Sequence, residues 1–173
     1  MDFTDPQKEE SLTLEKALHY FDYNPQTGSL KWKSQPSSKT HIGTEAGTLN
    51  RNGYILVGFE KKYYLAHRLA WLIAHGCWPK LVLDHINGKS TDNRIENLRE
   101  CTFANNMKNQ RLSKSNKSGV KGVHWNSSKR KWIAKIGVSY KEKTIGSYNS
   151  LEDAKTAVIQ ARTALHGEFA NHG

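Results

Sequence analysis

A seven-residue segment rich in serine, lysine and glycine, SKSNKSG at 113–119, divides the chain into two parts with different patterns. This composition is typical of a linker. The chain has 173 residues, of which 36% are hydrophobic, and its mean hydropathy is −0.74. These values favour small units with modest cores over one large core. We therefore expect an α+β protein with one domain at 1–112 and a second at 120–173.

The first part is expected to begin with short elements joined by turns. In chain order, the predicted elements are a helix at 11–22, a β-hairpin at 53–59 and 63–67, and a helix at 67–76. Ser11 or Thr13 is expected to cap the first helix, and Gly76 to end the last. His67 is expected to pack or to form a hydrogen bond at the helix start, although a ligand role is the alternative.

The centre of the chain reads as strand, loop, strand and helix. The apolar run 81–83 predicts a strand that ends in Asp84-His85, and NLREC (97–101) predicts a second strand after a polar loop. The following FANNMKNQRL reads as a helix with Thr102 as its N-cap. Taken alone, the Asp-His pair is more typical of a turn cap beside an exposed imidazole.

The residues after this pair favour a metal site. In a strand–loop–strand–helix unit, the end of the first strand faces the helix, so a side chain from each can bind one cation. Carboxylate and amide oxygens suit Mg²⁺ or Mn²⁺ rather than zinc. A metal with few protein ligands keeps positions for water and a phosphate oxygen, and an imidazole beside it can take a proton from the water.

The stretch LDHINGKSTDNRIENLRECTFANNMKNQ resembles the His-Asn-His (HNH) nuclease motif in the form found in phage and intron homing endonucleases. The shared landmarks are Asp84-His85, Asn97-Leu98-Arg99 and Thr102 followed by Asn106. The resemblance covers most of residues 11–110. It implies a ββα-metal (His-Me finger) core near 81–111, preceded by a helix and hairpin region.

The resemblance also implies roles for individual residues. His85 would be the general base, Asp84 and Asn106 the ligands of Mg²⁺ or Mn²⁺, and Asn97 a structural residue that orients His85. Asn106 stands where many relatives have histidine, and its spacing from the helix cap favours it over Asn105. The alternative is that these asparagines only cap loops and helices. No structural zinc is expected.

Basic residues near the motif are candidates for phosphate contacts, with simple surface solvation as the alternative for each. They are Arg68, Lys89, Arg94 and Arg99.

The excess charge of the chain is confined to one segment. The formal net charge is +10, and residues 107–147 hold eleven basic residues against Glu142 alone, which also gives +10. Such one-sided charge favours a polyanionic partner. Nucleic acid is favoured over an anionic membrane or simple solubility.

Downstream of the linker, the pattern predicts a three-stranded antiparallel sheet with one helix on one face. The strands are expected at 120–126, 131–138 and 143–148, and the helix at 150–167 with a start that resembles a capping box. Its apolar stripe includes Leu151, Val158 and Leu165. On the middle strand, Trp132, Ala134 and Ile136 are expected to face the helix, and Lys131, Ile133, Lys135 and Gly137 to face outward.

Residues 116–170 resemble the APETALA2 (ethylene-response-factor-like) DNA-binding domain. The shared landmarks are Lys121-Gly122-Val123, Lys131-Trp132-Ile133-Ala134, Ile145-Gly146-Ser147-Tyr148, Glu152-Asp153-Ala154 and LHGEFAN. The resemblance implies that the exposed sheet face lies in the DNA major groove. Trp125 is expected either to stack on DNA or to cover the sheet edge. The predicted DNA-contacting residues of this part are Lys121, His124, Trp125, Asn126, Lys129, Arg130, Lys131, Lys135, Lys143 and Thr144.

The function we expect is that of a site-specific, homing-type DNA endonuclease that uses one divalent metal and nicks by default. The alternative is a non-catalytic DNA-binding regulator with an inert HNH core. RNA binding is a weaker reading, because the aromatic platform expected for single strands is missing. Double-stranded DNA is the expected partner, with a monomer favoured.

The remaining features point to a soluble, intracellular protein. Cys77 and Cys101 form no C-x-x-C pair, and neither a signal peptide nor a membrane-length apolar run is evident. A cytoplasmic location is expected, in the host cell if the gene belongs to a phage.

Overall fold

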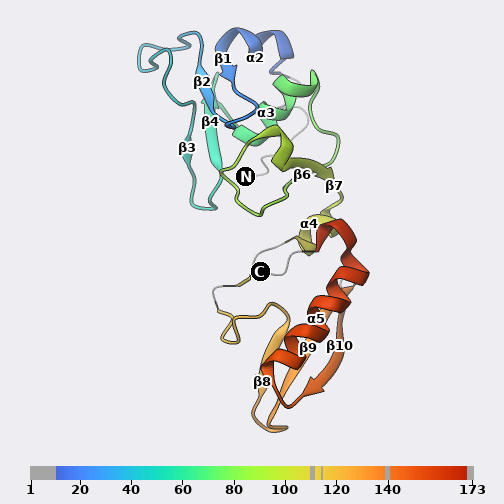
Figure 1. Cartoon of the computed structure of the whole chain (residues 1–173). Helices are drawn as coiled ribbons and strands as arrows, with labels where there is room; N and C mark the ends of the chain where they lie inside the picture. The colour runs from blue at the N-terminus through green and yellow to red at the C-terminus, as the bar shows by residue number, and fades with distance from the viewer. Residues whose placement is uncertain (1–10, 110–111, 114, 139–140, 171–173) are drawn as a thin grey trace. The chain divides into compact units, whose positions relative to one another are not determined.

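The computed structural model describes residues 11–109, 112–113, 115–138 and 141–170. The chain forms two compact units, Met1–Cys101 and Thr102–Gly173 (Figure 1). The boundary between the units precedes the helix that follows Thr102, whereas the predicted domain boundary follows that helix.

The first unit combines short helices with small antiparallel sheets. α2 (Leu14–Tyr20) leads into a two-stranded sheet of β1 (Phe21–Tyr23) and β2 (Leu30–Trp32). A second sheet has the order β3 (Thr48–Leu49), β4 (Ile55–Phe59) and β5 (Lys62–Leu65). α3 (Ala66–His75) follows β5 directly, and then β6 (Val82–His85) pairs with β7 (Leu98–Cys101), with the short helix η1 (Ile95–Asn97) between them.

Local sequence explains where these elements begin and end. The Thr13 hydroxyl accepts a hydrogen bond from the Lys16 backbone N–H at 3.3 Å, so Thr13 rather than Ser11 caps α2. Glu60 and Lys61 both have positive φ, as a two-residue hairpin turn between β4 and β5 requires. Gly76 takes the left-handed conformation, with φ of 78°, and ends α3. The predicted helices and hairpin of this part are confirmed, and α2 is shorter than expected.

An aromatic core holds the first unit together. The ring centroids of Phe21 and Trp32 lie 4.8 Å apart, and those of Phe21 and Phe59 lie 5.7 Å apart. Leu12 and Leu69 are buried in the same cluster. This core joins α2, the two sheets and α3, and the β6–β7 hairpin belongs to the same unit.

The predicted strand–loop–strand pattern in the centre is confirmed. β6 and β7 pair with Asp84 opposite Arg99 and His85 opposite Leu98. In the second unit, the Thr102 hydroxyl accepts a hydrogen bond from the Asn105 backbone N–H at 3.3 Å and caps α4 (Phe103–Lys108). α4 ends earlier than predicted, and residues 110–111 lie outside the described part of the chain.

The second unit contains the predicted three-stranded sheet on one helix. The strand order is β10 (Lys141–Tyr148), β9 (Lys131–Val138) and β8 (Val123–Asn126), and α5 (Leu151–His166) packs on one face before the short η2 (Gly167–Phe169). The Ser150 hydroxyl accepts from the Asp153 backbone N–H at 3.1 Å and caps α5. The core is small and contains Val123, Ala134, Ala154 and Val158.

One expectation about this small core is wrong, and one residue of the outward face is more buried than its position suggests. Leu165 was expected in the buried stripe of the helix but is 49% exposed, whereas Arg162 is buried because its guanidinium donates to the Lys121 carbonyl at 2.7 Å. Ile133 has the outward parity of Lys131 and Lys135, as expected, yet it is only 6% exposed. It lies on the central strand, between His124 and Ser147 of the neighbouring strands, and these flank its side chain.

Candidate active site

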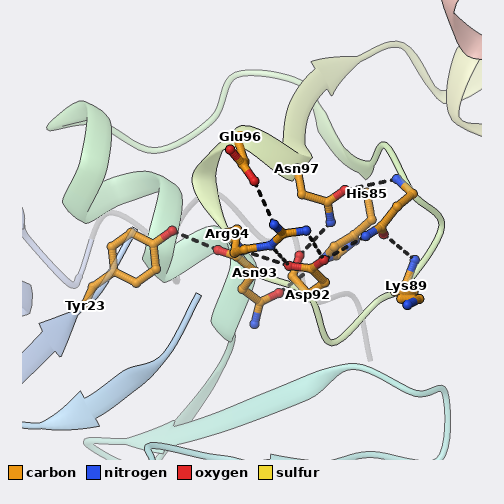
Figure 2. Close-up of polar contacts among 9 residues, drawn as sticks. Tyr23, His85, Lys89, Asp92, Asn93, Arg94, Glu96 and Asn97 are labelled. Carbon is orange, nitrogen blue, oxygen red and sulfur yellow. Dashed lines mark hydrogen bonds and ion pairs between the residues drawn. The ribbon is translucent and has the colours of Figure 1, made fainter. Parts of the chain in front are cut away.

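The candidate site of the first unit is built where β6 ends and the loop to η1 begins (Figure 2). Asp84 and His85 are 4% and 5% exposed, and Asn93 and Asn97 are also buried. The exposed imidazole of a simple turn is therefore excluded. Buried polar groups need partners, so the hydrogen bonds of these four residues define the site.

His85 is held by a residue of the same loop. Its Nε2 lies 3.1 Å from the side-chain Oδ1 of Asn93. Burial lowers the pKa of His85, and the hydrogen bond to Asn93 and the charges of Asp84 and Asp92 offset part of that effect. A lowered pKa favours the neutral imidazole, which is the form that can accept a proton.

An aromatic wall borders the imidazole of His85. The ring of His67 meets it edge to face with centroids 4.9 Å apart, and Tyr54 lies 6.1 Å from it. Burial lowers the pKa of His67 well below its usual range, and the neighbouring His85 and Arg68 act in the same direction. His67 thus packs at the start of α3 as a neutral ring, in line with its expected packing role.

Asp84 is paired with Arg99 across the β6–β7 hairpin. The Nε and Nη2 atoms of Arg99 both lie 2.9 Å from Oδ2 of Asp84. The register explains the contact, because the two residues are direct partners on neighbouring strands. The carboxylate therefore has a cationic neighbour inside the site.

Asn97 fixes the loop between β6 and η1. Its Oδ1 accepts from the Asn87 backbone N–H at 3.0 Å, and its Nδ2 donates to the Asp92 carbonyl at 2.7 Å. Its own carbonyl accepts from the Ile86 N–H at 2.9 Å. The direct contact to His85 comes instead from Asn93, which the sequence analysis did not single out, because its position in a polar turn carries no periodic signal.

The predicted phosphate-binding cations near the motif have different surroundings. Arg68 is buried and donates to the carbonyls of Pro79 and Leu81, at 3.2 and 3.4 Å. Arg94 pairs with Asp92 and Glu96, and its hydrogen bonds hold the pKa of the Asp92 carboxyl far below its usual range. Of the four candidates, Lys89 is the one that is exposed as a whole residue, whereas Arg94 and Arg99 are partly buried.

Asn106, the second predicted metal ligand, lies on α4 in the second unit, partly buried. The adjacent Asn105 differs from it, because its Oδ1 accepts from the Lys108 ammonium at 2.9 Å. Among the described residues, no group of three or more histidine, cysteine or acidic side chains is arranged to bind a metal.

The predicted DNA-contacting residues of the second unit fall on different faces. The strand pairing puts His124, Asn126, Lys131, Lys135 and Thr144 on the face opposite α5. Lys129 and Arg130 lie in the exposed β8–β9 turn, where the Asn126 side chain accepts from the Lys129 N–H at 2.8 Å. Lys135 also pairs with Glu142 at 3.1 Å.

Three of these residues lie elsewhere. Trp125 shares the side of Trp132, where the two rings meet edge to face with centroids 5.2 Å apart, and it is 48% exposed. Lys143 pairs with Ile136 and takes that same side. Lys121 is partly buried and donates to the Lys108 carbonyl at 3.2 Å; burial, with Arg162 nearby, lowers its pKa to about 8.

Comparison with known proteins agrees with the central motif. Residues 64–108 match a family model described as HNH endonuclease. Protein 3.8 of Escherichia phage T7 is 32% identical over 114 residues, which covers 64% of this chain and 93% of that protein. No solved structure matches the chain.

The matched segment contains α3, β6, the loop to η1, β7 and α4, and so includes Asp84, His85, Asn93 and Asn97. Within the described part of the chain, no helix is long and apolar enough to cross a membrane. The chain belongs to the family of phage T7 Protein 3.8 and carries an HNH endonuclease domain at residues 64–108.

Proposed function

We propose that this protein is a homing-type DNA endonuclease that hydrolyses a phosphodiester bond with His85 as the general base. The observation that carries the proposal is the buried His85 beside Asp84, in a segment that matches the HNH endonuclease family. Burial favours the neutral imidazole near pH 7, and Asn93 fixes its orientation. A base needs both properties to take a proton from water.

We assign the metal ligands to Asp84 and Asn106, as parts of a ββα-metal core. The donor chemistry supports Mg²⁺ or Mn²⁺, because one carboxylate and one amide supply hard oxygen atoms and neither supplies sulfur. Asp84 already pairs with Arg99 at 2.9 Å, so its carboxylate lies beside a cation. When bound, the ion would supply positive charge to the phosphate and the leaving oxygen.

The second unit is proposed to hold double-stranded DNA in the manner of the APETALA2-type domains it resembles. The basic segment 107–147 supports this role, and so do the exposed Lys129, Arg130 and Lys131 at one end of the sheet. With one site per chain, the expected product of a monomer is a nick.

A second candidate function is a DNA-binding regulator with an inert nuclease core. The Arg99–Asp84 ion pair favours it, because a guanidinium already neutralises the carboxylate that would bind the metal. The two candidates differ in whether DNA is cut, and both require DNA binding.

Supercoiled plasmid incubated with the protein and Mg²⁺ separates the two. The wild type should convert it to the nicked form, and His85→Ala should slow the conversion by about 10² to 10⁴-fold. Cleavage that persists in the variant would remove His85 from its role. Binding without cleavage by the wild type on any DNA offered would favour the regulator.

A further inference from the structure

Asn93 is the most deeply buried polar residue of the candidate site. It is 2% exposed and lies eight positions after the proposed base, in the loop that leads to η1. Its Oδ1 lies 3.1 Å from Nε2 of His85. Both residues are labelled in Figure 2. An amide oxygen accepts hydrogen bonds and does not donate them. The contact therefore requires the hydrogen of the neutral ring to be on Nε2, with the lone pair on Nδ1.

The backbone of Asn93 is braced by the turn between β1 and β2. The Tyr23 hydroxyl donates to the Asn93 carbonyl at 2.8 Å, and the Ile95 N–H donates to the Pro25 carbonyl at 3.2 Å. Gly28 lies so close that an added Cβ would be 2.5 Å from the Arg94 nitrogen and 2.7 Å from the Asn93 carbonyl carbon. A segment some 70 residues upstream thus fixes where Asn93 can lie.

Asn97 has a different task. Its side chain contacts the backbone of Asn87 and Asp92 and so holds the shape of the loop. The described contacts between an asparagine side chain and the ring of His85 come from Asn93. Loss of Asn97 should disturb the whole loop, whereas loss of the Asn93 amide should disturb the imidazole.

We propose that Asn93 is the positioning residue of the base: its amide oxygen holds the Nε2–H tautomer of His85 and so fixes the orientation of the imidazole. The segment 23–29, which is the end of β1 with the turn that follows it, is the brace that keeps Asn93 in place. The role of His85 as the base rests on the proposed nuclease function, whereas the tautomer itself does not.

Two variants of similar size test the proposal in the full-length protein. Asn93→Asp keeps an acceptor oxygen, whereas Asn93→Leu removes it. Long-range ¹H–¹⁵N spectra should report the Nε2–H tautomer of His85 in the wild type and in Asn93→Asp, and its loss in Asn93→Leu. An Nδ1–H tautomer in the wild type, or an unchanged tautomer in Asn93→Leu, would overturn the proposal.

Cleavage rates add a second readout. In Asn93→Leu, kcat should fall about 10- to 100-fold, as is typical when a residue that orients a reactive group is lost. KM and DNA affinity should stay the same, and Asn93→Asp should restore most of the rate. A purely structural role predicts instead that both variants lose rate only in proportion to their unfolded fraction.

Tyr23→Phe covers the case in which Asn93→Leu fails to fold, because it removes one hydroxyl from the brace. It should lower kcat a few-fold, whereas Tyr64→Phe, whose hydroxyl contacts Ser11 at 3.3 Å, should not. Equal rates in both variants would remove the brace from the proposal. The two proposals can also fail separately. If the wild type cuts no DNA but Asn93→Leu still loses the Nε2–H tautomer of His85, the nuclease function is refuted and the positioning role stands.

Discussion

The loop around His85 and the outer surface of the C-terminal sheet use polar residues in opposite ways. In the loop, Asn93 and Asn97 are buried and hydrogen-bonded, and nearby Arg94 and Arg99 pair with carboxylates. On the sheet, Lys129, Arg130 and Lys131 are exposed, and no ion pair is found for them among the described residues.

The difference indicates two separate roles, one in holding the geometry of the site and one in binding phosphate. Buried and satisfied polar groups hold one geometry, as a reacting centre requires. Exposed cations contribute little to the stability of the fold. They attract phosphate groups at long range, and their binding releases counterions from the nucleic acid. Substitutions in the loop should therefore affect stability and turnover, whereas substitutions on the sheet should affect DNA affinity.

The largest effect on stability is expected from Asn97→Ala. The change leaves the Asn87 N–H and the Asp92 carbonyl without their partner. Both hydrogen bonds are partly buried, and a typical intramolecular hydrogen bond contributes about 0.5–1.5 kcal/mol, so the free energy of unfolding should fall by about 1–3 kcal/mol. Urea unfolding measures it. Asn126→Ala is the matched control, because its hydrogen bond lies in an exposed turn. An equally large fall in the free energy of unfolding in this control would contradict the contrast between the buried loop and the exposed sheet.

The next effect is on DNA binding, in the triple variant Lys129→Ala, Arg130→Ala and Lys131→Ala. If each side chain contacts one phosphate, the slope of log affinity against log salt should become shallower by about 3. Fluorescence anisotropy on duplex DNA over a salt series measures the slope. Stability should change by less than about 0.5 kcal/mol. An unchanged slope would show that this turn does not contact DNA.

A smaller effect is expected when the pH is lowered. His67 has a depressed pKa in the fold, so below about pH 6.5 the unfolded chain takes up a proton that the folded chain does not. Stability should therefore fall as the pH drops from about 7.5 to about 5.5.

His67→Phe keeps a ring against Tyr54 and His85 and should flatten this pH dependence, although His85 retains its own part. His124→Gln, in an exposed position of the second unit, serves as the control. Urea midpoints at the two pH values measure the effect. The same slope in the wild type and in His67→Phe would show that His67 is not the source.

The smallest effect is expected from Ser150→Ala, which removes the N-cap of α5. The loss should be about 1 kcal/mol and should be confined to the second unit. Hydrogen exchange can show this, because protection should decrease in α5 and remain in β6 and β7. A decrease of the same size in the β6–β7 hairpin would indicate that the two units unfold together.

Periodicity and turn chemistry were enough to predict most elements. The helices at α3 and α5, the hairpins and the caps at Thr102 and Ser150 follow from local signals that the fold does not override. The resemblance to the HNH motif also pointed to Asp84, His85 and Asn97, which lie close together in the first unit.

The contacts within the site could not be predicted in the same way. The pairing of Arg99 with Asp84 depends on strand register, and the contact of Asn93 with His85 depends on the path of an irregular loop. The burial of Arg162 in place of Leu165 likewise follows from one long-range hydrogen bond to a carbonyl. Each of these depends on tertiary structure, for which a single sequence carries no periodic signal.

The most direct test of the account is the single-turnover rate of plasmid nicking with Mg²⁺, at protein concentrations that saturate the DNA. The wild type and the triple sheet variant should then cut at the same rate, because saturation removes the difference in affinity. His85→Ala should be slower by about 10² to 10⁴-fold while binding DNA equally well. A His85→Ala rate equal to that of the wild type, or no nicking by the wild type on DNA that it binds, would contradict the assignment of catalysis to the buried loop.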